Sequence, residues 1–118
     1  MAAAVAVVLA GAGVAGATHE SFKGGAVYYS DELKGETMAC GGEYQPWKMV
    51  AAHRDLPCGT RLKVKNLTNG EVVKVTVKDR GPYGDEDVVL DVSKKAAKKL
   101  GFYGEGKTEV KAKILHAD

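Results

Sequence analysis

The chain has 118 residues, with 17 Lys and Arg against 15 Asp and Glu, a formal net charge of +2, and 45% hydrophobic residues. This length supplies one hydrophobic core and leaves no room for a second domain. Domains that bind nucleic acid usually carry a concentrated basic stripe, which so small a net charge does not indicate. We therefore expect one domain and no nucleic-acid partner.

Residues 1–17 are predicted to be an export signal peptide. After Met1 this segment contains only Ala, Val, Leu and Gly, and it ends in the small-x-small sequence Ala15-Gly16-Ala17. It is shorter than the roughly 20 apolar residues of a membrane span, it lacks the usual basic n-region, and its glycines disfavour the alternative of an ordered helix. We expect a linker over residues 18–23, a domain over 24–115, a tail over 116–118, and a secreted, periplasmic or cell-wall location without a membrane anchor.

Five segments have the apolar pattern of β-strands: residues 25–30, 61–67, 71–78, 87–92 and 108–115. Asn69-Gly70 is predicted to join two of them through a type I′ hairpin turn. One helix is clear over residues 94–100, with Ser93 as its N-cap and Gly101 as its stop. Several short strands with a single helix predict a mainly β protein built as a small barrel.

The predicted helix has a basic side. Lys94, Lys95, Lys98 and Lys99 lie opposite Ala96, Ala97 and Leu100 when the segment is helical. A solvated helix face explains this arrangement, and attraction to an anionic wall polymer is the alternative.

Cys40 and Cys58 are the two cysteines of the chain and lie 18 positions apart. In an exported protein an even count favours a disulfide, which would contribute about 3 kcal/mol in the chain-entropy model, over two buried thiols. No CxxC pair or histidine cluster indicates a metal site. Neither cysteine lies in a lipobox, so lipid anchoring is not indicated.

Asp79 ends an alternating strand and precedes Arg80-Gly81-Pro82-Tyr83. Gly81 and Pro82 predict a turn here, so the carboxylate lies at the rim of a rigid β scaffold, where functional sites gather. The alternative from local sequence is that Asp79 only caps this turn through the backbone.

The chain resembles the rare lipoprotein A (RlpA-like) domain through ordered motifs that run over residues 24–115. These motifs are Gly25-Ala26-Val27-Tyr28-Tyr29, Gly35-Glu36-Thr37-Met38-Ala39, Met49-Val50-Ala51-Ala52-His53, Leu56-Pro57-Cys58-Gly59-Thr60, Val64-Lys65-Asn66-Leu67-Thr68-Asn69-Gly70, Asp79-Arg80-Gly81-Pro82-Tyr83 and Leu90-Asp91-Val92-Ser93. The resemblance implies a six-stranded double-psi β-barrel. It also implies peptidoglycan lytic transglycosylase activity with Asp79 and His53 as the functional pair, and no cofactor or metal.

The barrel is also similar to those of expansins, barwin-like proteins and secreted protease inhibitors. Cys40 and Cys58 resemble the disulfide positions of expansin-like domains, and Asp91 resembles an Asp of the expansin groove. The lipobox and the C-terminal SPOR domain of full-length RlpA proteins have no counterpart in this sequence. A binding module for wall polysaccharide, or a secreted inhibitor, is therefore the alternative to an enzyme.

The expected reaction needs one acid. A lytic transglycosylase protonates the leaving oxygen, and the 6-hydroxyl of the sugar attacks the anomeric carbon to leave a 1,6-anhydromuramoyl end. Asp79 would serve as acid and base, which requires it to be protonated part of the time near neutral pH. We expect Asp91, Arg80, Tyr83, Tyr29 and Trp47 to contact the glycan strand, although some of the aromatic side chains could belong to the core. The protein is expected to act as a monomer.

Overall fold

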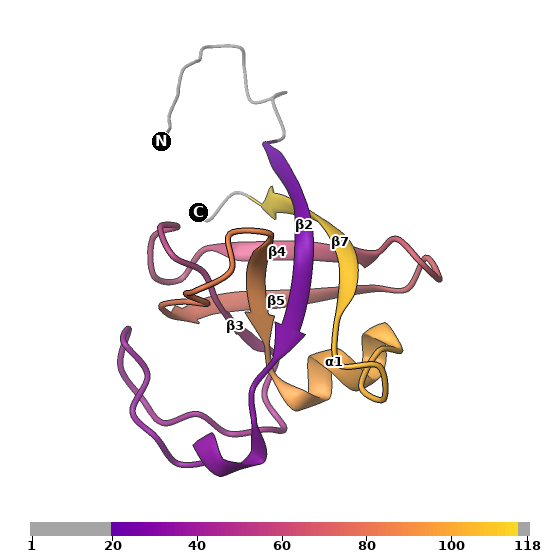
Figure 1. The fold of residues 1–118 in the computed structure, drawn as a ribbon. Coiled ribbons are helices and arrows are strands. Elements are labelled where there is room, and N and C mark those ends of the chain that lie inside the picture. The colour runs from indigo at the N-terminus through magenta and orange to yellow at the C-terminus, as the bar shows by residue number, and fades with distance from the viewer. Residues whose placement is uncertain (1–19, 116–118) are drawn as a thin grey trace, which may run out of the picture.

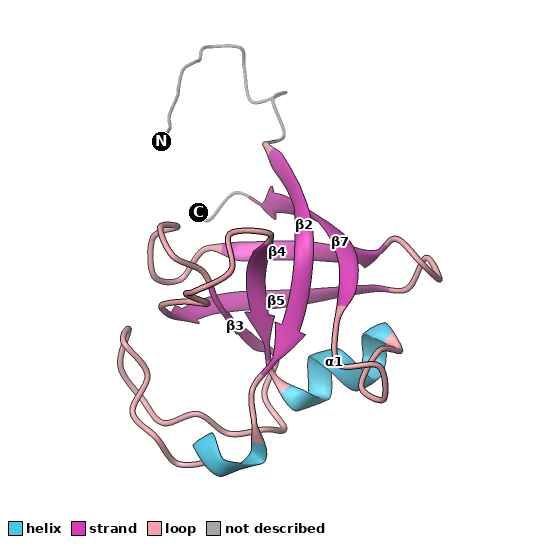
Figure 2. Ribbon diagram, in the orientation of Figure 1, coloured by secondary structure: helices cyan, strands magenta, loops and turns pink. Residues whose placement is uncertain are grey.

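The computed structural model describes residues 20–115, which form a closed barrel of six strands with one α-helix at its end (Figures 1 and 2). The expected signal peptide and tail lie outside the described residues. The strands are β2 (Ser21–Tyr28), β3 (Val50–Ala52), β4 (Arg61–Asn66), β5 (Val72–Asp79), β6 (Val88–Val92) and β7 (Thr108–Leu115). The helices are a 3-10 turn, η1 (Asp31–Leu33), and α1 (Lys94–Leu100). The prediction of a mainly β, six-stranded barrel is confirmed.

The strands follow the order β2-β6-β3-β5-β4-β7 around the barrel. The pairs β2/β6 and β3/β5 are parallel, and the other four pairs are antiparallel. Every strand therefore has two neighbours, so the barrel offers no open edge for pairing with another chain.

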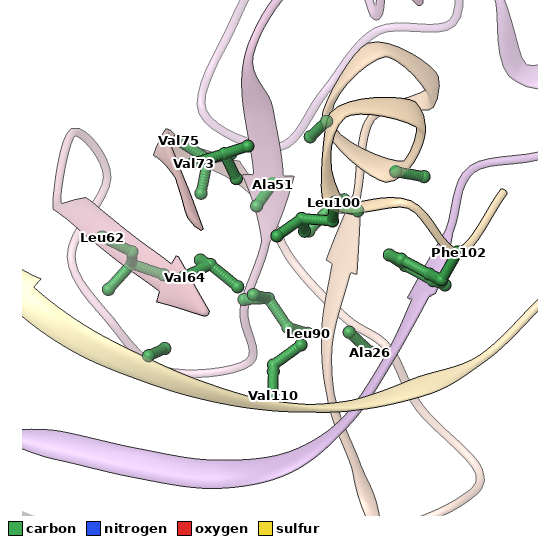
Figure 3. Close-up of a cluster of buried hydrophobic side chains, with 14 of the residues drawn as sticks. Ala26, Ala51, Leu62, Val64, Val73, Val75, Leu90, Leu100, Phe102 and Val110 are labelled. Carbon is green, nitrogen blue, oxygen red and sulfur yellow. The ribbon is translucent and has the colours of Figure 1, made fainter. Parts of the chain in front are cut away.

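The alternating residues of the strands meet inside the barrel (Figure 3). Leu62 and Val64 of β4, Val75 of β5 and Val110 of β7 are almost fully buried, as the period of two predicts. Charged residues such as Lys63 and Lys65 occupy the intervening positions and are exposed. The interior is therefore a packed apolar core, and chemistry must take place on the outside of the barrel.

The helix α1 closes one end of this core (Figure 1). The Ser93 hydroxyl accepts a hydrogen bond from Ala96 N at 3.3 Å, and Gly101 ends the helix in the left-handed region at φ 82°. A side chain at position 101 would also approach Asn69 Nδ2 to 2.7 Å. Both predicted caps are confirmed, and they hold the turn between β6 and α1 in place.

Three local features differ from the sequence-based expectation. Ser21–Tyr28 is one strand, so the last three residues of the expected linker pair with β7 as part of the barrel. β3 was not expected, since three residues are too few to show a period. The β4–β5 loop is longer than a two-residue turn, because Asn66 N donates to Glu71 O and Gly70 N donates to Asn66 O.

No helix within residues 20–115 has the length and apolar character needed to cross a membrane.

Candidate active site

A second apolar cluster lies outside the barrel, against β3. Val50 and Ala52 of β3 join Tyr29, Met38 and Tyr44, which come from the long segment between β2 and β3 (Figure 1). The intervening Ala51 belongs to the barrel core. The outer face of β3 is therefore covered by the segment between β2 and β3, which packs onto it.

The carboxylate of Asp79 is held at the edge of this second apolar cluster. Its Oδ2 accepts a hydrogen bond from the Tyr29 hydroxyl at 2.6 Å, and its Oδ1 accepts from Ala39 N at 2.7 Å and Arg80 N at 2.9 Å. All three groups are donors, and a carboxylate is an acceptor at both oxygens. The orientation of Asp79 is fixed from three sides before any ligand binds.

A β-bulge directs Asp79 to this face. Strict alternation along β5 would place it on the inward side, after Val77. The β3–β5 register instead shifts by one residue, because Ala51 pairs with Val77 but Ala52 pairs with Asp79. An extra residue in one strand re-aims the following side chain, a recurrent feature beside active sites.

Asp91 flanks the same alanine from the other side. Ala52 pairs with Asp91 across the antiparallel β3–β6 ladder and with Asp79 across the β3–β5 ladder. Directly paired residues point to the same face, so both carboxyls project over Ala52, on strands that lie about 10 Å apart. Ala52 contributes only a methyl group and is 2% exposed, because the segment between β2 and β3 packs over it.

The two carboxyls differ in their surroundings. Burial, followed by repulsion from Asp79, raises the pKa of Asp91 to about 7. Among the described residues no group donates to Asp91 Oδ1, which is buried. Near neutral pH a substantial fraction of Asp91 is therefore protonated beside the Asp79 carboxylate.

Tyr29 reinforces this arrangement as a hydrogen-bond donor. Burial, then the hydrogen bond and charge of Asp79, raises the pKa of the Tyr29 phenol far above its usual value. Its ring stacks on Tyr44 with centroids 4.2 Å apart. The Tyr44 hydroxyl in turn accepts from Lys94 N at 3.0 Å, and burial raises its pKa as well. The aromatic pair thus connects Asp79 to the start of α1.

The hydrogen bonds of the His53 ring run to its own loop. Its Nδ1 accepts hydrogen bonds from Asp55 N at 3.0 Å and Leu56 N at 3.1 Å. Its ring packs on Phe22 in a T-shaped arrangement, with the ring centroids 5.1 Å apart. Burial lowers the pKa of His53, opposed by Asp55 and reinforced by Arg54. His53 N donates a backbone hydrogen bond to Asp79 O at 3.1 Å. The imidazole is a neutral acceptor that caps the loop after β3.

Arg80 and the disulfide tie three loops together around Asp79. The Arg80 guanidinium donates to His53 O at 3.1 Å and to Leu56 O at 2.7 Å, and it lies 3.6 Å from Cys58 Sγ. Cys58 is bonded to Cys40, with Cα atoms 5.8 Å apart, which confirms the predicted disulfide. Cys40 follows Ala39, the residue whose N–H reaches Asp79. The bridge therefore fixes one of the donors to this carboxylate.

The remaining aromatic residues of the predicted site are exposed. Trp47 is 56% exposed and Tyr83 is 72% exposed, in contrast to the buried Tyr29. Trp47 lines an open hollow of about 360 Å³ together with Pro46 and four lysines of α1, Lys94, Lys95, Lys98 and Lys99. Tyr83 follows Pro82 in the loop between β5 and β6. These two side chains are the ones available to stack on a ligand.

Comparison with known proteins assigns the family. The model of the lytic transglycolase family matches residues 21–112, nearly all of the described chain. The chain belongs to this family. The RlpA-like resemblance is therefore confirmed, and the site described above lies within the matched residues.

Relatives of this chain carry the name RlpA. The chain is 43% identical over 88 residues to the endolytic peptidoglycan transglycosylase RlpA of Pseudomonas aeruginosa, covering 75% of this chain and 26% of that protein. It is 45% identical over 93 residues to a protein of Aquifex aeolicus under the same RlpA name, covering 79% of this chain and 41% of the relative. The chain thus spans less than half the length of these relatives.

The fold also matches a solved expansin. An expansin variant from Clavibacter michiganensis, in complex with cellohexaose, superposes with a TM-score of 0.66 at 22% identity, covering 84% of this chain and 52% of the expansin chain. At this identity the likeness concerns the barrel architecture.

Three features of this RlpA-like site were missed by the sequence analysis. The Ala39 side chain gives no sign that the Ala39 N–H binds Asp79, and the segment that holds Tyr44 has no period from which its stacking on Tyr29 could be predicted. Arg54 donates to Pro82 O and Val88 O, both at 3.0 Å, and so holds the loop that carries Tyr83. For the role of Arg54, the only sign in the sequence was its position directly after the Ala51-Ala52-His53 motif.

Proposed function

We propose that this protein is a lytic transglycosylase that cleaves the glycan strands of peptidoglycan and leaves 1,6-anhydromuramoyl ends. The family and the names of the RlpA relatives support this class of reaction. The observation that carries the mechanism is the pair of carboxyls over Ala52, in which Asp91 has a pKa of about 7 and Asp79 accepts three hydrogen bonds.

The two carboxyls support divided roles. Protonated Asp91 donates its proton to the glycosidic oxygen as the bond to the anomeric carbon breaks. The Asp79 carboxylate stabilises the positive charge that develops at that carbon. The 6-hydroxyl then attacks the anomeric carbon and gives its proton to Asp91, which restores the starting state without water. This assignment moves the acid and base roles that the sequence suggested for Asp79 to Asp91.

The proposed roles of the other predicted residues follow from their contacts. His53 and Arg80 position the loop beside Asp79, since the hydrogen bonds of their side chains run to backbone groups and, for Arg80, to Cys58 Sγ, and none runs to the two carboxyls. Trp47 and Tyr83 offer exposed rings to the sugar units of the strand. We also propose that the protein works as an exported monomer in the cell wall, because its disulfide suits an oxidising compartment.

Purified sacculi and peptide-free glycan strands test the activity, with mass analysis of the released sugars for anhydro ends. Asp91→Asn should abolish release at every pH. Asp79→Asn should lower kcat and move the alkaline decline in rate to lower pH, because repulsion from Asp79 contributes to the raised pKa of Asp91. Residual activity of Asp91→Asn above that of Asp79→Asn would return the acid role to Asp79.

A binding module without turnover is the second candidate. The expansin in complex with cellohexaose and the exposed Trp47 favour it. Pull-down with insoluble peptidoglycan, cellulose and chitin separates the two candidates when it is run beside the product analysis. Retention of the wild type on a polymer without anhydro products supports the module.

A further inference from the structure

The strand register gathers six lysines on one outer face of the barrel. Lys74 of β5 pairs with Lys63 of β4, which pairs with Lys113 of β7. Two residues further along β4, Lys65 pairs with Lys111 of β7, which pairs with Lys23 of β2. These two sets of three, called here the lysine rows, run around the barrel across its strands.

The lysine rows point away from the core. The residues between them, Val64 on β4, Val73 on β5 and Ala112 on β7, are buried in the barrel. All members of the rows are exposed except Lys113, which is half-buried. Paired Cβ atoms lie about 5 Å apart, and the two rows are separated by about 7 Å along each strand. The six ammonium groups therefore form a compact array on a rigid scaffold.

No acidic partner compensates this array within residues 20–115, where the one ion pair joins Lys94 to Asp31. Glu109 on β7 and Asp79 at the end of β5 are the acidic residues on the outer face of these strands. Like charges placed directly opposite each other on a sheet are destabilising. The net charge of +2 conceals the array, because acidic residues gather in the loops after β2 and before β6, at Asp31, Glu32, Glu36, Glu43, Asp85, Glu86 and Asp87.

We propose that the lysine rows bind a linear acidic polysaccharide with one carboxylate per sugar, which runs around the barrel across β5, β4, β7 and β2. Successive strands are about 4.8 Å apart, a spacing comparable to the advance of a polysaccharide chain by one pyranose ring. Three successive carboxylates of such a chain meet the three ammonium groups of one row, and charge complementarity is the source of the attraction.

The curvature of the face that carries the lysine rows favours binding of a polymer chain over binding of a lipid bilayer. The lysine rows span four of the six strands of a closed barrel, so a flat surface reaches only part of them. The exposed aromatic residues Trp47 and Tyr83 lie outside these strands, whereas membrane-interface sites favour Trp and Tyr. A flexible polymer follows the curve and contacts both rows.

The lysine rows are independent of the proposed active site. In the order β2-β6-β3-β5-β4-β7, the strand opposite β3 is β7, which carries Lys111 and Lys113. Lys111 and Lys113 thus lie on the strand opposite Ala52, whereas Lys74 shares β5 with Asp79 and lies nearer the other end of that strand. One molecule is able to hold an acidic polysaccharide on one side while the other side remains free.

The test uses polygalacturonate as the probe, with binding followed by fluorescence anisotropy at several salt concentrations. The row variant is Lys63→Gln/Lys65→Gln/Lys111→Gln. The matched control, Lys95→Gln/Lys98→Gln/Lys99→Gln, removes the same three charges from α1. A third variant, Lys63→Arg/Lys65→Arg/Lys111→Arg, keeps the charge of the rows.

We expect the row variant to bind roughly tenfold or more weakly, with a shallower dependence on salt, because half of the fixed charges are lost. The helix control and the arginine variant should stay within about twofold of the wild type, since the rows keep their charge in both. Equal losses in the row variant and the helix control would overturn the proposal, since they would indicate non-specific attraction.

Two further probes test whether the lysine rows prefer another class of polyanion. Wild-type protein should bind polygalacturonate more tightly than polyphosphate or phosphatidylglycerol vesicles. Tighter binding to the vesicles would indicate that this face binds a membrane. Tighter binding to polyphosphate would indicate that it binds a phosphate polymer. Either result would overturn the polysaccharide assignment. These measurements need no turnover, so they are distinguishable from failure of the proposed activity.

Discussion

Asp91→Asn should make the protein more stable at neutral and alkaline pH while removing its activity. In the fold the pKa of Asp91 is raised to about 7, from its ordinary value of 3.8. Ionised Asp91 therefore destabilises the fold relative to the unfolded chain. This cost is absent below the unfolded pKa, grows as the pH rises, and is complete above about pH 7.

The difference between the two pKa values corresponds to about 4 kcal/mol when Asp91 is fully ionised. Asparagine carries no charge at any pH, so the variant should gain up to about 4 kcal/mol at pH 8 and less than about 1 kcal/mol at pH 4. Urea unfolding of wild type and variant at both pH values measures this difference. Asp87→Asn is the matched control, because Asp87 is exposed and lies on the loop that leads into the same strand.

A gain that is equal at pH 4 and pH 8 would refute the reasoning, since a pH-independent effect comes from packing and not from ionisation. A gain of the same size in Asp87→Asn would refute it as well, because it would reflect the net charge of the chain. Stabilisation together with loss of turnover is the pattern expected when a site retains a buried charge for function.

The other predictions concern the loops around the site. Cys40→Ser/Cys58→Ser should lose about 3 kcal/mol of stability in urea unfolding, and an unchanged midpoint would mean that the bridge does not constrain the unfolded chain. His53→Asn should retain more activity than His53→Ala, because an amide oxygen can accept the two backbone N–H groups; equal loss in both would assign the imidazole to the chemistry. Trp47→Ala/Tyr83→Ala should weaken retention on peptidoglycan in a pull-down without changing the circular dichroism spectrum, and unaltered retention would exclude these rings from binding.

The sequence was sufficient where structure depends on local pattern. The alternation of Val73, Val75 and Val77 predicted β5, and Ser93 and Gly101 predicted the ends of α1, because periods and caps are properties of neighbouring residues. The disulfide followed from the number of cysteines and the export signal. The family motifs supplied the six-stranded double-psi topology of the barrel, which no local pattern contains.

The geometry of the site could not be predicted in the same way. A bulge between two strands decides that Asp79 shares a face with Asp91, and this register belongs to the pairing and not to either strand. The exposure of an acid also depends on what covers it, so the raised pKa of Asp91 required the packed fold. The lysine rows were missed for a related reason, since their members come from strands far apart in the chain.

The separation of the two apolar clusters has a consequence for how such a protein can change. The first cluster is enclosed by the strands and α1, and the second depends on the segment between β2 and β3. Substitutions, insertions or exchanges in that segment can alter the cover over Asp79 and leave the barrel interior intact. Ligand preference can therefore diverge among proteins with the same barrel through one replaceable stretch of chain, provided that its bridge to Cys58 and its N–H at Ala39 are kept.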